Sequence, residues 1–116
     1  MVVRSIRDAR GSEIELKPIV PLLDRVVRSW NPQSIWLFGS RARGEAVGAS
    51  DWDLLVVVPD DTPDVDDPLA GWHLRKDLDV RSDLFLCRVS EFVEDRNTPN
   101  TIAFEAAHGG ALIYER

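Results

Sequence analysis

Two neighbouring segments carry most of the structural information in this sequence: Leu37-Phe38-Gly39-Ser40-Arg41-Ala42-Arg43-Gly44 and, a short loop later, Ser50-Asp51-Trp52-Asp53-Leu54-Leu55-Val56. In the first segment an apolar run ends at Gly39, where the lack of a side chain lets the backbone approach a ligand closely. Ser40 then offers a hydroxyl and a backbone N–H at what reads as a helix start, a place that favours anions. The first segment is therefore predicted to bind phosphate groups.

The second segment contains two acidic residues at strand spacing. Asp51 and Asp53 lie two residues apart in a predicted strand, so both carboxylates project from the same face. Like charges this close disfavour joint ionisation unless a cation lies between them, and carboxylate oxygens are ligands that Mg²⁺ selects. The apolar run from Leu54 to Val58 predicts a buried strand that holds the pair rigidly. We therefore predict a metal site at Asp51 and Asp53.

A third carboxylate would complete a two-metal site, in which one ion activates the attacking oxygen and the other stabilises the departing pyrophosphate. Asp83 is the candidate, because it is followed by Leu84-Phe85-Leu86 in the next predicted strand and is expected to face the first two across the sheet. Asp77 and Asp79 are alternatives, although both precede that strand.

The remaining pattern predicts an α/β (α+β) fold, a small mixed sheet with helices packed on it, in a single domain spanning residues 1–116. The predicted helices cover residues 17–30, 69–78, 90–96 and 98–108, with Ser90 as the N-cap of the third. The predicted strands cover residues 34–38, 51–58 and 80–87, with a terminal strand or tail at 111–114. Residues 1–16 are expected to form a short arm with an edge strand at 14–16.

Composition limits the classes of function. A formal net charge of −6 offers no broad basic surface, so general nucleic-acid binding is disfavoured. The single cysteine, Cys87, has no partner for a disulfide or a zinc site, which fits a reducing cytoplasm. No apolar run reaches the length of a signal peptide or a membrane span, so we expect a soluble cytoplasmic protein with no membrane contact. The acidic stretch Asp60 to Asp67 is expected to be a solvated connector, with a surface for a basic partner as the alternative.

The motifs as a whole resemble a known signature. Gly39-Ser40, Arg43-Gly44 and Ser50-Asp51-Trp52-Asp53-Leu54 resemble the signature of the polymerase-beta-like nucleotidyltransferase superfamily, in particular its minimal nucleotidyltransferases. The strand around Asp83, the Ser90-Glu91-Phe92 helix start and the ending from Phe104 to Glu115 look like the same group. The resemblance implies that Asp51 and Asp53 ligate two Mg²⁺ ions, that Asp83 ligates one and accepts the acceptor's proton, and that Ser40 contacts the nucleotide phosphates. Ser82 departs from the family pattern, which places an apolar residue there.

Two arginines in the signature allow two interpretations. Arg41 and Arg43 either meet triphosphate oxygens, which would add them to Gly39, Ser40 and Ser50 as nucleotide-binding residues, or hold the loop by structural ion pairs. The histidines and tryptophans are expected to have structural roles, because the histidines lack neighbouring ligands at metal spacing and the tryptophans are spread over different elements.

The resemblance also implies a function. It implies transfer of a nucleoside monophosphate, AMP from ATP, onto a hydroxyl of an acceptor. Because members of the group are typically encoded beside a helical HEPN-type toxin and act as its antitoxin, such a toxin is the expected partner and acceptor. Two alternatives remain open: a non-catalytic antitoxin that neutralises its toxin by binding, and small-molecule adenylylation of the aminoglycoside type, against which the lack of an evident acceptor domain counts. The sequence leaves open the base preference and the oligomeric state, a homo-oligomer included.

Overall fold

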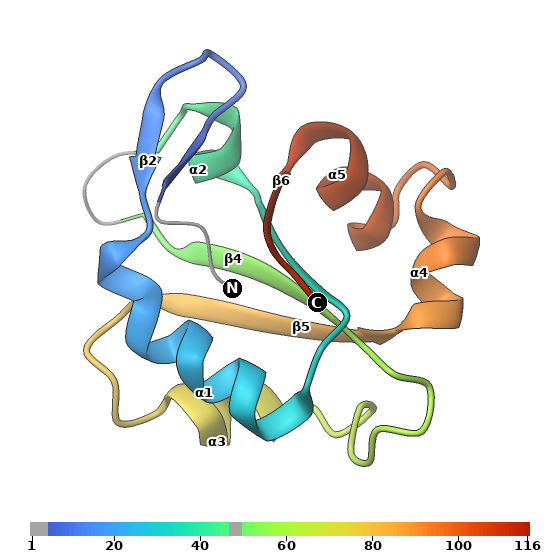
Figure 1. The fold of residues 1–116 in the computed structure, drawn as a ribbon. Helices are drawn as coiled ribbons and strands as arrows, with labels where there is room; N and C mark the ends of the chain where they lie inside the picture. Colours follow the sequence, from blue (N-terminus) through green and yellow to red (C-terminus); the bar gives the residue numbers. More distant parts are fainter. Residues whose placement is uncertain (1–4, 47–49) are drawn as a thin grey trace.

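A mixed sheet of four strands forms the centre of the molecule, with the strand order β5-β4-β3-β6 (Figure 1). The computed structural model describes residues 5–46 and 50–116. The strands of the main sheet are β3 (Ser34–Phe38), β4 (Trp52–Val58), β5 (Ser82–Arg88) and β6 (Ala111–Glu115). β3 is antiparallel to both β4 and β6, whereas β4 and β5 are parallel. A separate antiparallel pair is formed by β1 (Ser5–Arg7) and β2 (Glu13–Glu15).

Helices cover both faces of the main sheet (Figure 1). A 3₁₀ turn (Lys17–Ile19), α1 (Val20–Trp30) and α3 (Ala70–Arg75) lie on one face. α4 (Val89–Asp95) and α5 (Ile102–Gly109) lie on the other, and the short α2 (Ser40–Arg43) follows β3 directly. Proline is tolerated where the predicted helix begins, because the first backbone N–H groups of a helix have no intrahelical partner.

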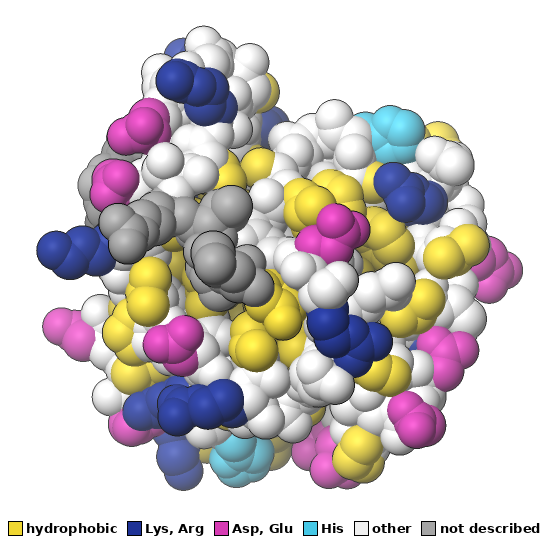
Figure 2. Space-filling view, viewed as in Figure 1, with side chains coloured by type: hydrophobic (Ala, Val, Ile, Leu, Met, Phe, Trp, Pro, Cys, Tyr) yellow, Lys and Arg dark blue, Asp and Glu magenta, His cyan; other side chains and the backbone are white. Residues whose placement is uncertain are grey.

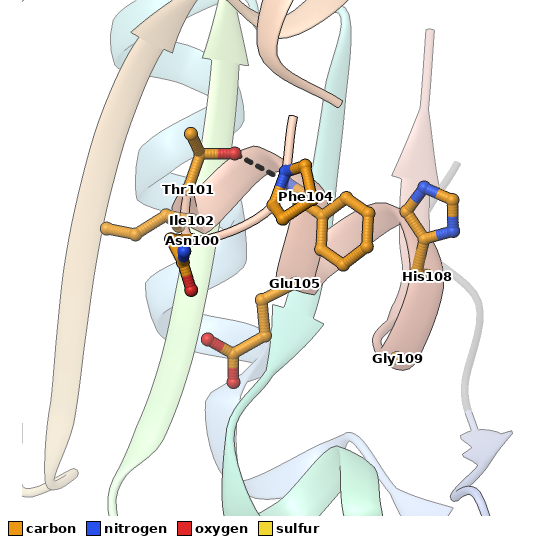
Figure 3. Close-up of a pocket in the computed structure, with 8 residues that line it drawn as sticks. Asn100, Thr101, Ile102, Phe104, Glu105, His108 and Gly109 are labelled. Atoms are coloured by element: carbon orange, nitrogen blue, oxygen red, sulfur yellow. Dashed lines mark hydrogen bonds between the residues drawn. The ribbon is translucent and has the colours of Figure 1, made fainter. Parts of the chain in front are cut away.

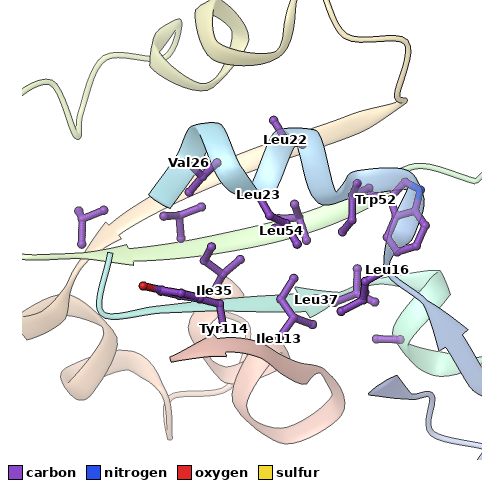
Figure 4. Packing of buried hydrophobic residues seen from close by; sticks show 14 of the residues in the cluster. Leu16, Leu22, Leu23, Val26, Ile35, Leu37, Trp52, Leu54, Ile113 and Tyr114 are labelled. Atoms are coloured by element: carbon purple, nitrogen blue, oxygen red, sulfur yellow. The ribbon is translucent and has the colours of Figure 1, made fainter. Parts of the chain in front are cut away.

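Strand alternation divides the core between the two helix layers. The larger cluster joins α1 to alternate residues of β3 and β4, and Figure 4 shows Leu23 of α1 beside Leu54 of β4. The second cluster joins α4 and α5 to the other alternate residues, among them Phe38, Leu55 and Val57. Each strand therefore contributes side chains to two separate apolar layers.

The predicted α/β fold is confirmed, with three local corrections. Residues 5–15 form the β1–β2 hairpin, so the predicted edge strand at 14–16 corresponds to β2, which pairs with β1. Ser90 is not an N-cap: the cap is Arg88, whose backbone N–H donates to Glu91 Oε1 at 2.9 Å. β4 begins at Trp52, so Asp51 lies just before the strand rather than in it.

The acidic stretch after β4 makes specific contacts, which the expectation of a solvated connector missed. Asp60 Oδ1 accepts a hydrogen bond from the Ser90 backbone N–H at 3.0 Å, and Asp66 pairs with Arg88 at 2.7 Å. Two of its carboxylates therefore fix the start of α4.

Charged side chains are interspersed over the face shown in Figure 2, where lysines and arginines stand among acidic residues instead of gathering into one basic surface. In the part of the chain that the structure describes, no helix is long and apolar enough to cross a membrane.

Candidate active site

Asp53 is the second residue of β4, which lies between β3 and β5 in the sheet. Its Cα partner on the antiparallel side is Phe38, the last residue of β3, and on the parallel side it is Asp83. Because residues two apart on a strand share a face, Asp53 lies on the face of Leu55 and Val57, which α4 and α5 cover. The strand register thus brings Asp53 and Asp83 to the same face of adjacent strands.

The pKa of the Asp53 carboxyl is raised above its ordinary value. Partial burial is the largest cause, the charges of Asp83 and Asp51 follow, and Glu105 adds to them while Arg43 opposes. Burial and like charge both disfavour the ionised form of a carboxyl group. Asp53 therefore lies at the centre of a group of negative charges, which is the electrostatic setting that a bound cation relieves.

The two outer carboxylates are engaged by arginines. Asp51 Oδ1 lies 3.2 Å from Arg81 Nε, and Asp83 Oδ1 lies 3.8 Å from Arg75 Nη2. Across residues 5–46 and 50–116, no three His, Cys, Asp or Glu side chains are grouped so that they could hold a metal ion. The three carboxylates are thus neighbours by register and by electrostatics, but they do not form a closed set of ligands.

Gly39 places the start of α2 against Asp53. It directly follows β3 and is the N-cap of α2, with φ 79° and ψ −159°, a conformation that is essentially confined to glycine. A Cβ built on Gly39 would overlap Oδ2 of Asp53. Ser40 is the first residue of α2, where backbone N–H groups lack intrahelical partners. The two residues predicted to bind phosphate therefore lie next to the central carboxylate.

The other predicted nucleotide-binding residues have protein partners. Arg41 donates from Nε and Nη2 to the Ser50 carbonyl oxygen at 3.1 and 2.7 Å, and its guanidinium carbon lies 4.3 Å from the centroid of the Trp52 ring. Arg43 pairs with Glu45 at 2.7 Å and with Glu105 at 3.1 Å. Structural contacts, one of the two interpretations that the sequence left open, are therefore present at both arginines. Contact of either arginine with phosphate stays a prediction.

Sequence reasoning did not single out Arg75, Arg81 or Glu105 as site residues. Arg81 directly precedes the strand that carries Asp83. Its position beside this acidic residue was a signal in the sequence that could have identified it as a site residue. The sequence around Arg75 and Glu105 held no such signal, because their partners lie in other elements of the chain. Ser82, by contrast, is 4% exposed, so the polar residue that departs from the family pattern still occupies a core position.

Two hollows lie near the Asp53 end of the sheet, and one of them is lined by Asp83. The first, of about 380 Å³, lies along the outer side of β5, where Asp83 and Phe85 meet Gly71, Trp72 and Arg75 of α3. The second, of about 340 Å³, is lined by Arg41, Ser50, Trp52, Arg81 and Asp79 among others. Asp79, one of the alternatives to Asp83, thus lines the hollow beside Arg41 of α2. The other alternative, Asp77, pairs with Arg25 at 2.6 Å.

A larger hollow, of about 660 Å³, lies on α5 and is lined by Pro99, Asn100, Thr101, Ile102, Phe104, Glu105, His108 and Gly109 (Figure 3). The rings of Phe104 and His108 are stacked with centroids 4.2 Å apart, and His108 Nε2 is 3.1 Å from Asn97 Oδ1. Figure 3 shows the Glu105 side chain pointing away from these two rings. Because none of the three aspartates lines this hollow, its size does not make it the active site.

Comparison with known proteins identifies the family. No curated protein matches the chain. A crystal structure of a Sulfolobus solfataricus protein described as a nucleotidyltransferase is similar over 87% of this chain and 80% of that chain, with a TM-score of 0.60 and 23% sequence identity, and this likeness shows the fold. The model of the family described as "Nucleotidyltransferase domain" matches residues 20–103, a stretch that contains Gly39, Asp51, Asp53 and Asp83. With most of its length matched, the chain belongs to the nucleotidyltransferase domain family.

Proposed function

We propose that this protein transfers AMP from ATP onto a hydroxyl group of a HEPN-type toxin and thereby acts as the toxin's antitoxin. Membership of the nucleotidyltransferase domain family supports nucleotidyl transfer in general. The observation that carries the proposal is the pairing of Asp53 with Asp83 in register, with the Gly39 backbone against the Asp53 carboxylate.

Asp51, Asp53 and Asp83 would hold Mg²⁺. Their fit rests on the chemistry of the donor set: hard carboxylate oxygens from adjacent positions, with the pKa of Asp53 raised by burial and by its acidic neighbours. When bound, Mg²⁺ neutralises charge on the phosphates and makes the attacking hydroxyl more acidic.

The chain's own residues would bind the phosphates and accept a proton. Gly39 and Ser40 hold the nucleotide phosphates, and Asp83 accepts the proton that leaves the acceptor hydroxyl. The acceptor oxygen forms a bond to the α-phosphorus while the bond from that phosphorus to the pyrophosphate oxygen breaks, and pyrophosphate leaves.

The position of the phosphates also sets the side from which the acceptor approaches. In-line displacement puts the attacking and leaving oxygens on opposite sides of the phosphorus. With the phosphates at Gly39 and Ser40, on the β3 side of Asp53, the acceptor approaches from the β5 side. The hollow of about 380 Å³ that adjoins Asp83 lies on that side and gives the acceptor room.

A partner protein is proposed as the acceptor because no described helix or strand is left to position a second substrate. The described helices and strands all belong to the main sheet, its two helix layers, the β1–β2 hairpin and the short α2. Attack requires the acceptor oxygen within about 3–3.5 Å of the phosphorus, and a docked partner fixes such a position.

The test is transfer of label from α-labelled ATP. The protein is incubated with labelled ATP and Mg²⁺, with and without the HEPN-type product of the neighbouring gene, alongside Asp53→Asn and the control Asp61→Asn, which removes one charge from the exposed loop after β4. We expect label on the partner with wild type and Asp61→Asn, and none with Asp53→Asn. If the partner is never modified and Asp53→Asn still neutralises it fully, the transfer proposal fails and neutralisation by binding replaces it.

A further inference from the structure

The third carboxylate is in contact with a residue from the opposite side of the sheet. Asp83 lies on the face that α4 and α5 cover, whereas α3 packs with α1 on the other face, where Leu74 joins the larger core cluster. Arg75, the last residue of α3, nevertheless lies 3.8 Å from Asp83. Its side chain therefore reaches past the outer edge of β5 to the active-site face.

Close packing of α3 on β5 makes this reach possible. A Cβ added to Gly71 would lie 2.9 Å from the Leu84 Cβ and 3.1 Å from the Leu84 carbonyl oxygen, so the missing side chain is what allows the contact. Gly71 and Arg75 are four residues apart and share one face of the helix. Arg25 fixes the helix further, because it donates to the Leu74 carbonyl oxygen at 3.1 Å and pairs with Asp77 at 2.6 Å.

The side chain of Arg75 is better shielded from water than that of Arg81, which pairs with Asp51. The side chain of Arg75 is 27% exposed and that of Arg81 is 72% exposed. Arg75 Nε is buried and has no hydrogen-bond partner in the described part of the chain. Since solvent screens an exposed charge, the charge of Arg75 is screened less than that of Arg81.

We propose that Arg75 is a positioning residue that acts through Asp83: in the metal-free protein it holds the Asp83 carboxylate at the outer edge of β5 and thereby opposes closure of the aspartates around a divalent cation. Together with the Asp51–Arg81 pair, this contact fits carboxylates that lie close together yet form no group of three metal ligands in residues 5–46 and 50–116. A cation bound at Asp83 is repelled by the guanidinium. The inference rests on the proposed function only in requiring that the aspartates bind a metal.

The test is the affinity of the metal-free protein for Mn²⁺ alone, measured from the electron paramagnetic resonance signal of free Mn²⁺. Arg75→Met removes the charge and keeps most of the apolar stem, so we expect Mn²⁺ to bind about fivefold more tightly, the scale of a partly exposed ion pair. Arg75→Lys keeps a positive charge and should stay within about twofold of wild type. Arg25→Met is the matched control, because it loosens α3 and leaves the charge of Arg75 beside Asp83 in place. The affinity of this variant for Mn²⁺ should equal that of wild type.

The outcomes separate this inference from the proposed function. Unchanged or weaker Mn²⁺ binding in Arg75→Met overturns the inference, as does an equal gain in Arg25→Met, which would assign the effect to a loosened helix. If Arg75→Met does not fold, Arg75→Gln removes the same charge and must show the same gain. Asp53→Asn reports on the metal site itself: if it binds Mn²⁺ as wild type does, the aspartates are not the ligands and the proposed function loses its metal site, whatever Arg75 does.

Discussion

The two faces of the main sheet are built from alternate residues of the same strands, yet they differ in what they carry. On the face that meets α1, β4 contributes only apolar side chains from Trp52 onward, and Leu54 is completely buried. On the other face the same strand is apolar at Leu55 and Val57 and begins with Asp53. The neighbouring strand repeats this order, from Asp83 to Cys87, whose thiol has a pKa raised to about 12 mainly by burial.

This difference shows how one strand supports both stability and chemistry. A carboxyl group whose pKa is raised by burial and like charge is unfavourable when ionised, so it has to be held in place by contacts elsewhere. The face that meets α1 provides those contacts without involving the carboxylates. Substitutions on the α1 face should therefore change stability, and substitutions at the start of the other face should chiefly change binding.

The strongest test of this comparison is Leu54→Ala. It leaves a cavity between β4 and α1, so we expect a loss of about 2–5 kcal/mol in the free energy of unfolding, measured by urea denaturation. Val93→Ala is the control, because Val93 is 64% exposed and its truncation should cost about 0.5 kcal/mol or less. Equal losses in the two variants would contradict the assignment of the α1 face as the main source of stability.

A smaller loss is expected from Gly39→Ala, which brings strain to the boundary between strand and active site. The alanine would have to adopt a backbone conformation that only glycine adopts readily, and its Cβ would overlap the Asp53 carboxylate. We therefore expect a loss of about 1–3 kcal/mol in the free energy of unfolding, together with loss of ATP binding. Gly11→Ala is a matched control: Gly11 also has a positive φ, of 84°, but its added Cβ would meet nothing within 4 Å. The difference between the stability losses of Gly39→Ala and Gly11→Ala, measured by thermal or urea unfolding, reports the cost of the overlap with Asp53. Equal losses in the two variants would mean that the Asp53 side chain moves aside.

The smallest change in stability is expected from Asp53→Asn. The folded-state pKa of Asp53 is raised, so its contribution to stability is greatest below the unfolded value near 3.8 and is lost as pH rises through the folded pKa. At pH 7 the Asn variant should therefore be as stable as wild type or more stable by about 0.5 kcal/mol or less, because solvent screens this partly exposed group.

Two measurements complete that prediction. The advantage of Asp53→Asn should disappear when urea unfolding is repeated near pH 3.5, and calorimetry at pH 7 should show that the variant no longer binds Mg²⁺ or ATP. Marked unfolding of Asp53→Asn at pH 7 would instead make Asp53 a structural residue and remove the distinction between the two faces.

The sequence predicted the central strands well because their local signals are strong. The predicted strand 34–38 matches β3 at both ends, since the apolar run stands between the Asn31-Pro32 break and Gly39. β4 and β5 begin one and two residues later than predicted. Placement of Asp53 and Asp83 on one face follows from these strands, because parallel pairing and alternation leave little freedom.

The features that the sequence did not predict depend on contacts between distant segments. The first turn of α4 is bound by Asp60, thirty residues before Ser90, and Arg43 meets Glu105 at a separation of sixty-two residues. Nothing near Arg75 indicates Asp83 as its partner, because their contact follows from the packing of α3 on β5. The metal, the nucleotide and the partner stay predictions, since they depend on molecules outside the chain.

The parallel pairing of β4 with β5 determines where the chain tolerates insertions. Asp53 and Asp83 are matched by the strand ladder and not by the length of the connection between them. Lengthening an exposed loop costs little, so residues added near Pro63 should leave the two carboxylates side by side. One residue added inside β5 before Asp83 would turn that carboxylate to the α1 face and bury a charge in the core. Homologues can therefore differ widely in length between these strands, and an alignment of the family should be anchored on strand register rather than on spacing from Asp53.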